Sequence, residues 1–245
     1  MLEDKITAVI TTSPIPSHPS IHIIRDVYDS IRAQLPDIGI FILADGVRTE
    51  QSFFSKPYRG YISHLQNKYG KKFVKLHNKF YHQAAMLREF VLHENRVSTP
   101  YLLFMEHDWK FVGDPIDWKG VVELLEKGAV DCLRFAISKE RKWQLDRGES
   151  QRPVPHVMTD SYCTTGHIGS VEKFFKPLLT LYNEGHCHLC SEGVPGNPIG
   201  KYFAGESKRF NAAIYWPSPD PIRLHHLDGR GAGIEWAGPK LPMVL

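Results

Sequence analysis

The sequence predicts an α/β protein with an open, mostly parallel sheet, helices on both faces and a more mixed C-terminal half. Two observations lead to this prediction. Strand-like and helix-like segments alternate through residues 1–110 of the 245-residue chain, which is the pattern of parallel strands joined by crossover helices. The strand-like segment at residues 38–44 is also continuously apolar, as expected for a sheet that is covered on both faces.

Four segments of the first half have the β-branched or apolar composition of a strand, and polar residues or turns bound them. They are residues 5–12, 38–44, 72–76 and 101–105. Three segments between them are expected to be helical. They are residues 20–35, 48–70 and 82–97. Pro36 closes the first of these helices, and Pro57 and Gly60 are expected to break the second.

The second half has a more mixed pattern of elements. Its expected elements are a helix at residues 118–127, a strand at 131–137, an exposed loop or lid at 139–156, a helix from residue 171 and a further helix at 201–213. No repeat, low-complexity tract or interdomain linker stands out in the sequence. We therefore expect residues 1–245 to form a single domain.

The composition is that of an ordinary globular protein. Hydrophobic residues make up 42% and charged residues 23% of the chain, which argues against disorder and fibres. The net charge of +3 tolerates a polyanionic partner without requiring one. No apolar run approaches the length of a membrane span, and the acidic start does not resemble a signal peptide. We expect a cytoplasmic protein whose four cysteines are thiols.

Polar side chains follow three of the predicted strands. The first strand ends at Thr11 and Ser13, the second at Asp45, and the fourth at Glu106 and Asp108. The carboxyl ends of parallel strands meet at one edge of a sheet, where ligands bind. In an extended segment Glu106 and Asp108 point to the same side, and two carboxylates can share a divalent cation that holds a diphosphate. The alternative for such an acidic pair is a solvated turn or a helix cap.

The strand ITAVITTSP, the strand end at Asp45 and the triplet Glu106-His107-Asp108 together resemble the GT-A glycosyltransferases, which use nucleotide-sugar donors. The resemblance covers roughly residues 5–230. It implies that the strand with Thr11 and Ser13 opens the nucleotide pocket, and that Asp45 contacts base or ribose. The triplet is then a variant of the Asp-x-Asp motif, which holds Mn²⁺ or Mg²⁺ on the donor diphosphate. Glu in place of the first Asp departs from that motif.

The resemblance divides the domain into two halves. Residues 1–112 correspond to the nucleotide-sugar-binding half, and residues 113–245 to the acceptor-binding half with a C-terminal tail that serves as a lid. Arg88 is expected near the donor phosphates, with a surface arginine as the alternative. A late histidine, either His225 or His226, is expected to complete the coordination of the metal; the alternative is a pair of loop histidines.

An inverting transferase also needs a base that takes the proton of the acceptor hydroxyl. Glu192 best matches the position of the base in similar enzymes, with Asp160 second, and a solvent-exposed loop acid is the alternative. His167 is expected either to hydrogen-bond the donor sugar or to lie in the core. Arg230 belongs to a glycine-rich tail that can close over the bound diphosphate.

Cysteine spacing offers a separate hypothesis. Cys187 and Cys190 have the spacing of half a zinc site, and reduced thiols near a turn are the alternative.

The sequence thus predicts a metal-dependent glycosyltransferase that moves one sugar from a UDP-sugar to a hydroxyl, with inversion. Similar small proteins of bacteria and their phages act on cell-surface glycans, virion proteins or hydroxymethylated DNA bases. The mild basicity and the run KERK at residues 139–142 favour hydroxymethyl-pyrimidine DNA, and the expected location is the cytoplasm of a bacterium or a phage-infected host cell. A noncatalytic nucleotide-sugar-binding module is the alternative from another class. A nucleotidyltransferase is disfavoured, because SPIPSHP replaces the glycine-rich loop after the first strand.

Overall fold

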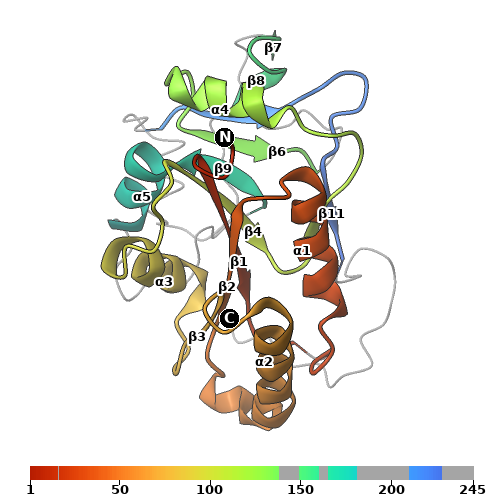
Figure 1. Ribbon diagram of the computed structural model, residues 1–245, viewed down its shortest axis with the longest axis vertical. Helices are drawn as coiled ribbons and strands as arrows, with labels where there is room; N and C mark the ends of the chain where they lie inside the picture. Colours follow the sequence, from red (N-terminus) through yellow and green to blue (C-terminus); the bar gives the residue numbers. More distant parts are fainter. Residues whose placement is uncertain (16, 138–148, 160–164, 181–209, 228–245) are drawn as a thin grey trace.

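The protein has a mixed sheet of nine strands with helices on both faces (Figure 1). This computed structural model describes residues 1–15, 17–137, 149–159, 165–180 and 210–227. The strand order is β3-β2-β1-β4-β9-β6-β10-β8-β7, and β5 and β11 form a second, two-stranded sheet. The predicted α/β class is therefore confirmed. None of the helices in these ranges is long and apolar enough to cross a membrane.

The N-terminal half of the large sheet is parallel. β1 (Ile6–Thr12) lies between β2 (Gly39–Ala44) and β4 (Tyr101–Glu106), and β3 (Val74–Leu76) pairs with the other side of β2. Every residue of β1 is buried, because strands flank it and helices cover both faces. This burial explains why its sequence, ITAVITT, has no charged residue and does not alternate between apolar and charged positions. The four strands expected in this half are all present.

The other half of the sheet is mixed. β9 (His167–Ser170) runs antiparallel to both β4 and β6 (Cys132–Phe135), and β10 (Ala212–Tyr215) runs parallel to β6. β8 (His156–Thr159) pairs antiparallel with β10, and β7 (Glu149–Ser150) forms the edge. Strands from both halves of the chain therefore share one sheet.

Two expectations for this half are wrong. The end of the helix expected at residues 201–213 is the start of β10, whose four residues are all buried. The segment expected to be an exposed loop at residues 139–156 contains β7 and the first residue of β8. β10 has four residues and β7 has two, so their sequence patterns are too short to distinguish a strand from a helix or a loop.

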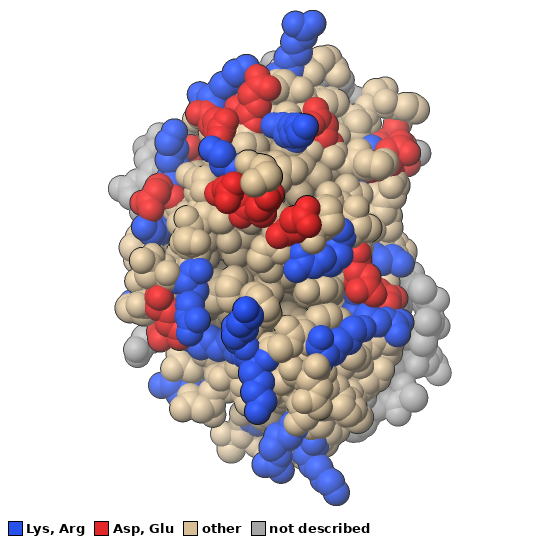
Figure 2. Space-filling view, viewed as in Figure 1, with Lys and Arg blue, Asp and Glu red and all other residues tan. Residues whose placement is uncertain are grey.

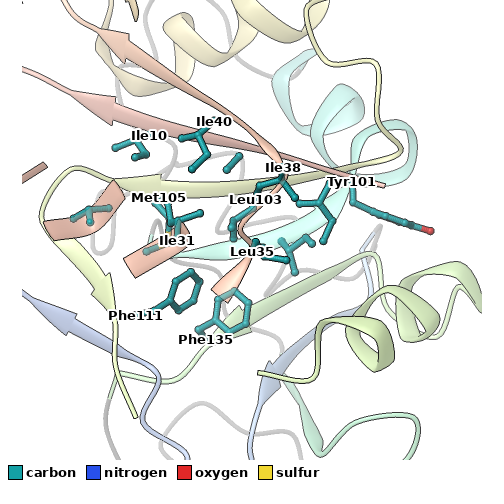
Figure 3. Close-up of a cluster of buried hydrophobic side chains, with 14 of the residues drawn as sticks. Ile10, Ile31, Leu35, Ile38, Ile40, Tyr101, Leu103, Met105, Phe111 and Phe135 are labelled. Carbon is teal, nitrogen blue, oxygen red and sulfur yellow. The ribbon is translucent and has the colours of Figure 1, made fainter. Parts of the chain in front are cut away.

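The helices divide between the two faces of the sheet. They are α1 (His22–Gln34), α2 (Ser55–Tyr69), α3 (His82–Arg88), α4 (Trp118–Glu126) and α5 (Lys176–Thr180), with the shorter η1 (Thr49–Phe54), η2 (Glu89–His93) and η3 (Val171–Phe175). α1, α2 and α4 pack in one core cluster with Ile10, and α3, η2, η3 and α5 in another with Val9. Figure 3 shows the first cluster, in which Ile31 of α1 lies near Met105 and Phe111, and Leu35, the residue after α1, lies near Leu103.

The breaks expected at Pro57 and Gly60 do not occur, because α2 continues through both residues. Pro57 lies in the first turn, where the missing N–H would have no helical partner in any case. Gly60 faces the segment before α1, and a Cβ atom there would lie 3.3 Å from Cβ of Pro19. A glycine at this position therefore permits close packing rather than ending the helix.

Candidate functional site

The carboxyl ends of β1, β2 and β4 lie side by side, as predicted. Thr11 is in register with Leu43 of β2 and Glu106 of β4, and the N–H of Asp45 donates to the carbonyl of Thr12 at 2.9 Å. Thr11 is 2% exposed, and its Oγ1 has no hydrogen-bond partner among the described residues. Such an atom normally requires a partner, which a bound ligand or water can supply.

Asp45 holds the start of α3 in place. Its Oδ1 accepts hydrogen bonds from the N–H groups of Gly46 and Tyr81 at 2.8 and 2.7 Å, and its Oδ2 accepts one from His82 at 2.8 Å. Burial raises the pKa of Asp45, while the three backbone donors act in the opposite direction. The structure thus shows a capping role for this carboxylate, and the contact with base or ribose stays a prediction.

The loop before α3 folds tightly over the end of β2. A Cβ atom on Gly46 would lie less than 3.0 Å from backbone atoms of Lys79 and Phe80, so only glycine fits beneath this loop. His82 has a φ of 62°, a left-handed conformation that costs energy in a residue with a side chain. The hydrogen bond from its N–H to Asp45 helps to hold this conformation.

The strand β4 ends at Glu106, and the chain turns at His107 and Asp108 before β5 (Trp109–Phe111) begins. The expectation of a fully extended segment through Asp108 is therefore wrong. The side chain of Glu106 accepts a hydrogen bond from Nε2 of Gln83 at 2.5 Å. The first acid of the triplet is thereby oriented by the first turn of α3.

Asp108 is paired with a histidine from the end of the described chain. Its carboxylate is 6% exposed, and Oδ2 lies 3.3 Å from Nε2 of His226. β11 (Leu224–His226) brings this histidine there by pairing with β5, which places His226 opposite Trp109. His225 is opposite Lys110 and exposed, because neighbouring residues of a strand point to opposite sides. Of the two predicted histidines, the structure brings only His226 to Asp108.

His18 is a buried polar residue near this turn that sequence reasoning did not select. It is 8% exposed, its ring stacks on Tyr61 at 3.8 Å between centroids, and its Nε2 has no hydrogen-bond partner in the described ranges. Burial, with the nearby positive charge of His107, lowers the pKa of His18 to about 3, so the ring is neutral at pH 7. Its position between two prolines, in PSHP, was the available signal.

Two residues predicted to contact the donor lie in the described ranges. His167 is fully buried, stacks on Phe175, and shares a hydrogen bond between Nδ1 and the carbonyl of Thr165 at 2.9 Å. Of the two alternatives for this residue, the structure therefore shows the core histidine. Arg88 is part-buried at the last position of α3, about 140° around the helix from Gln83, and its contact with the donor phosphates stays a prediction. Gln83 is the residue of α3 that contacts Glu106.

The remaining predicted residues lie outside the described ranges. They are Asp160, Glu192 and Arg230, together with the cysteines of the zinc hypothesis, Cys187 and Cys190. The side chain of Cys132 is buried in the core. Within the described ranges, no three His, Cys, Asp or Glu side chains gather closely enough to hold a metal ion between them. The metal thus stays a prediction, and Asp108 and His226 are the two predicted ligands that lie close to each other in the described ranges.

No known protein family matches the chain, and no curated protein matches its sequence. Among solved structures, residues 1–349 of TarS from S. aureus in complex with UDP-GlcNAc align with a TM-score of 0.50 and 10% identity, over 91% of this chain and 58% of that TarS segment. The complex of the same segment with UDP gives the same score and identity, with 60% of the segment covered. The chain spans about half of the first structures it matches, from 36% to 58% of their length. This likeness, with the strand order above, confirms that the chain has the GT-A-like fold expected from its sequence.

Proposed function

We propose that the chain is a metal-dependent glycosyltransferase, which transfers one sugar from a UDP-sugar to an acceptor hydroxyl with inversion. The observation that carries this proposal is the pairing of Asp108 with His226. Asp108 follows Glu106 by two residues, at the carboxyl edge of the parallel strands. The fold supports it, since TarS has a similar fold and was solved with UDP-GlcNAc and with UDP.

The donor set fits a divalent cation that is shared with a substrate. Asp108 and His226 offer a carboxylate oxygen and an imidazole nitrogen within 3.3 Å of each other, and both ligand types suit Mn²⁺. Mg²⁺ in phosphate-binding sites is held by one or two carboxylates, with substrate phosphates and water completing the shell. Two ligands from the described residues leave the other coordination positions for phosphate oxygens and water, as expected for a cation that binds together with the donor. When bound, it would offset the negative charge of the departing diphosphate.

The residues of the chain have separate tasks in this proposal. Gln83 keeps the Glu106 carboxylate oriented toward the edge, and Asp45 fixes the start of the helix that carries Gln83. The buried Oγ1 of Thr11 is available to hydrogen-bond the nucleotide. The base that takes the proton of the acceptor hydroxyl is Glu192, with Asp160 as the second candidate.

We infer that the acceptor is a hydroxymethyl-pyrimidine in DNA, because the chain is mildly basic overall. A glycan of the cell surface and a virion protein are the other acceptors to be tried. This acceptor places the reaction in the cytoplasm of a bacterial or phage-infected cell.

Replacement of Asp108 tests the metal site. We expect Asp108→Ala to abolish sugar transfer and to remove the gain in UDP affinity that Mn²⁺ produces, measured by calorimetry with and without the ion. His226→Ala should weaken that gain, whereas His225→Ala, a matched control one residue away, should preserve it. An Asp108→Ala variant whose UDP affinity still rises with Mn²⁺ would remove this carboxylate from the proposed metal site.

Replacement of Glu192 tests the base independently of the donor site. Glu192→Gln should stop transfer while leaving UDP affinity intact, because the amide cannot accept the proton. Asp160→Asn is the comparison that separates the two candidates. If Glu192→Gln retains the wild-type rate and Asp160→Asn loses it, the base is Asp160; if both retain it, neither acid has the proposed role.

A further inference from the structure

The charges of the chain are unevenly distributed along the sequence. Residues 51–88 contain eight Lys and Arg and no Asp or Glu, although the whole chain has 27 acidic residues and a net charge of only +3. The remainder of the chain is therefore net acidic. In Figure 2 the Lys and Arg side chains gather over the lower part of the molecule, where Figure 1 places α2, and the Asp and Glu side chains gather mainly in the upper part.

Six of these side chains are exposed, on α2, on the residues that follow it and in the loop after β3, and together they are called the basic face. They are Lys56, Arg59, Lys68, Lys71, Lys72 and Lys79. None of the six forms an ion pair with another described residue. Elsewhere, Lys5 pairs with Glu126 and Lys176 with Glu172. Among the described residues, no carboxylate thus offsets the positive charge of the basic face in an ion pair.

The packing of α2 argues against a lipid surface as the partner. Helices that bind membranes insert an apolar face, but the apolar residues of α2 (Tyr58, Tyr61, Ile62 and Leu65) are buried in the protein core. One exposed aromatic side chain, Phe53, precedes the helix. The exposed side of α2 offers charge without an apolar surface, which suits a hydrated polyanion.

The dimensions suit a phosphodiester backbone. α2 has 15 residues and is therefore about 22 Å long, which corresponds to about six phosphate steps along one strand of a duplex. The face also leads to the candidate site, since Lys79 lies over Gly46 at the carboxyl end of β2. A chain of phosphates bound along α2 would reach the edge where the donor is proposed to bind.

We propose that the basic face binds the phosphate backbone of duplex DNA and so delivers the acceptor base to the site. The role of that DNA as the acceptor rests on the proposed function. The binding of DNA to the basic face does not, because it requires neither the sugar donor nor catalysis. A duplex held this way is contacted mainly through its phosphates, so binding is expected to be strongly salt-dependent and largely independent of sequence.

The test is the anisotropy of a short fluorescein-labelled duplex without donor, titrated with protein between about 50 and 200 mM NaCl. The triple variant Lys56→Gln, Arg59→Gln, Lys68→Gln should bind at least about tenfold more weakly at low salt, and its slope of log K against log salt should be smaller by about 2 to 3. Lys119→Gln, Lys127→Gln, Lys173→Gln is the matched control. It removes the same charge from exposed positions on other elements and should bind like the wild type.

Three outcomes would overturn the inference. The first is a wild type that does not bind the duplex. The second is an equal loss of binding in the two triple variants, which would indicate net charge alone. The third is a basic face that is needed for binding vesicles of phosphatidylserine and phosphatidylcholine and not for binding DNA. UDP affinity with Mn²⁺, measured on the same proteins without DNA, reports on the donor site separately. Intact UDP binding with no DNA binding would reject the basic face and leave the transferase in place.

Discussion

The buried imidazole of His167 should make the protein less stable in acid by a predictable amount. Burial lowers the pKa of His167 to about 4, although the hydrogen bond that its ring shares with the Thr165 carbonyl opposes this shift. An unfolded histidine has a pKa of about 6.5, so below that pH the unfolded chain binds more protons than the native one. The free energy of unfolding therefore falls as the pH falls, by about 1.4 kcal/mol per pH unit, until the native pKa is reached. Between pH 7 and 5 the loss from His167 is about 2 kcal/mol.

His167→Phe isolates this contribution, because a phenyl ring keeps the stacking on Phe175 and cannot bind a proton. The variant should be less stable at pH 7 by about 1–3 kcal/mol, because the Thr165 carbonyl loses its partner. Its deficit should shrink by about 2 kcal/mol at pH 5. Urea unfolding across this pH range measures both values. Ile168→Val, on the same strand, should lower stability by a constant amount at every pH. Parallel curves for the wild type and His167→Phe would refute the argument.

The loop that caps β2 yields two further predictions. Gly46→Ala should lower the free energy of unfolding by about 1–3 kcal/mol, because its Cβ atom would displace the backbone of Lys79; thermal unfolding measures this, and an unchanged midpoint would show that the loop can move away. Asp45→Asn should cost about 1–3 kcal/mol in urea unfolding, because an amide cannot accept all three hydrogen bonds. The exposed Asp37→Asn, close in sequence, is the control, and an equal effect in both variants would exclude the capping role.

The parallel half of the fold was predictable because its strands are buried on both faces. The first five residues of β4, YLLFM, are all buried and form an apolar run that is distinctive in the sequence, and the helices between the strands have clear spacing. The short strands β9 and β10 gave no comparable signal. β9 is four residues long and contains His167, whose burial depends on aromatic residues from two other elements, Phe104 of β4 and the pair Phe174 and Phe175 of η3.

The site was predictable in its position but not in its contacts. Parallel strands deliver their carboxyl ends to one edge, so the clustering of Thr11, Asp45 and Glu106 followed from the order of elements alone. Which atoms meet there depends on loops. The capping of α3 by Asp45 requires residues 79–82 to fold back over Gly46, and no local pattern in the sequence encodes that path.

The choice between the two histidines near the C-terminus illustrates the same limit. His225 and His226 are adjacent and chemically identical, so composition and spacing cannot rank them. The register between β5 and β11 decides which histidine faces Asp108, since a shift of one residue would turn each side chain to the opposite side of the strand. That register is set by pairing between segments more than 110 residues apart, which places Leu224 in the core opposite Phe111. The burial of one leucine thus determines which imidazole reaches Asp108, and the proposed metal site depends on packing as much as on its ligands.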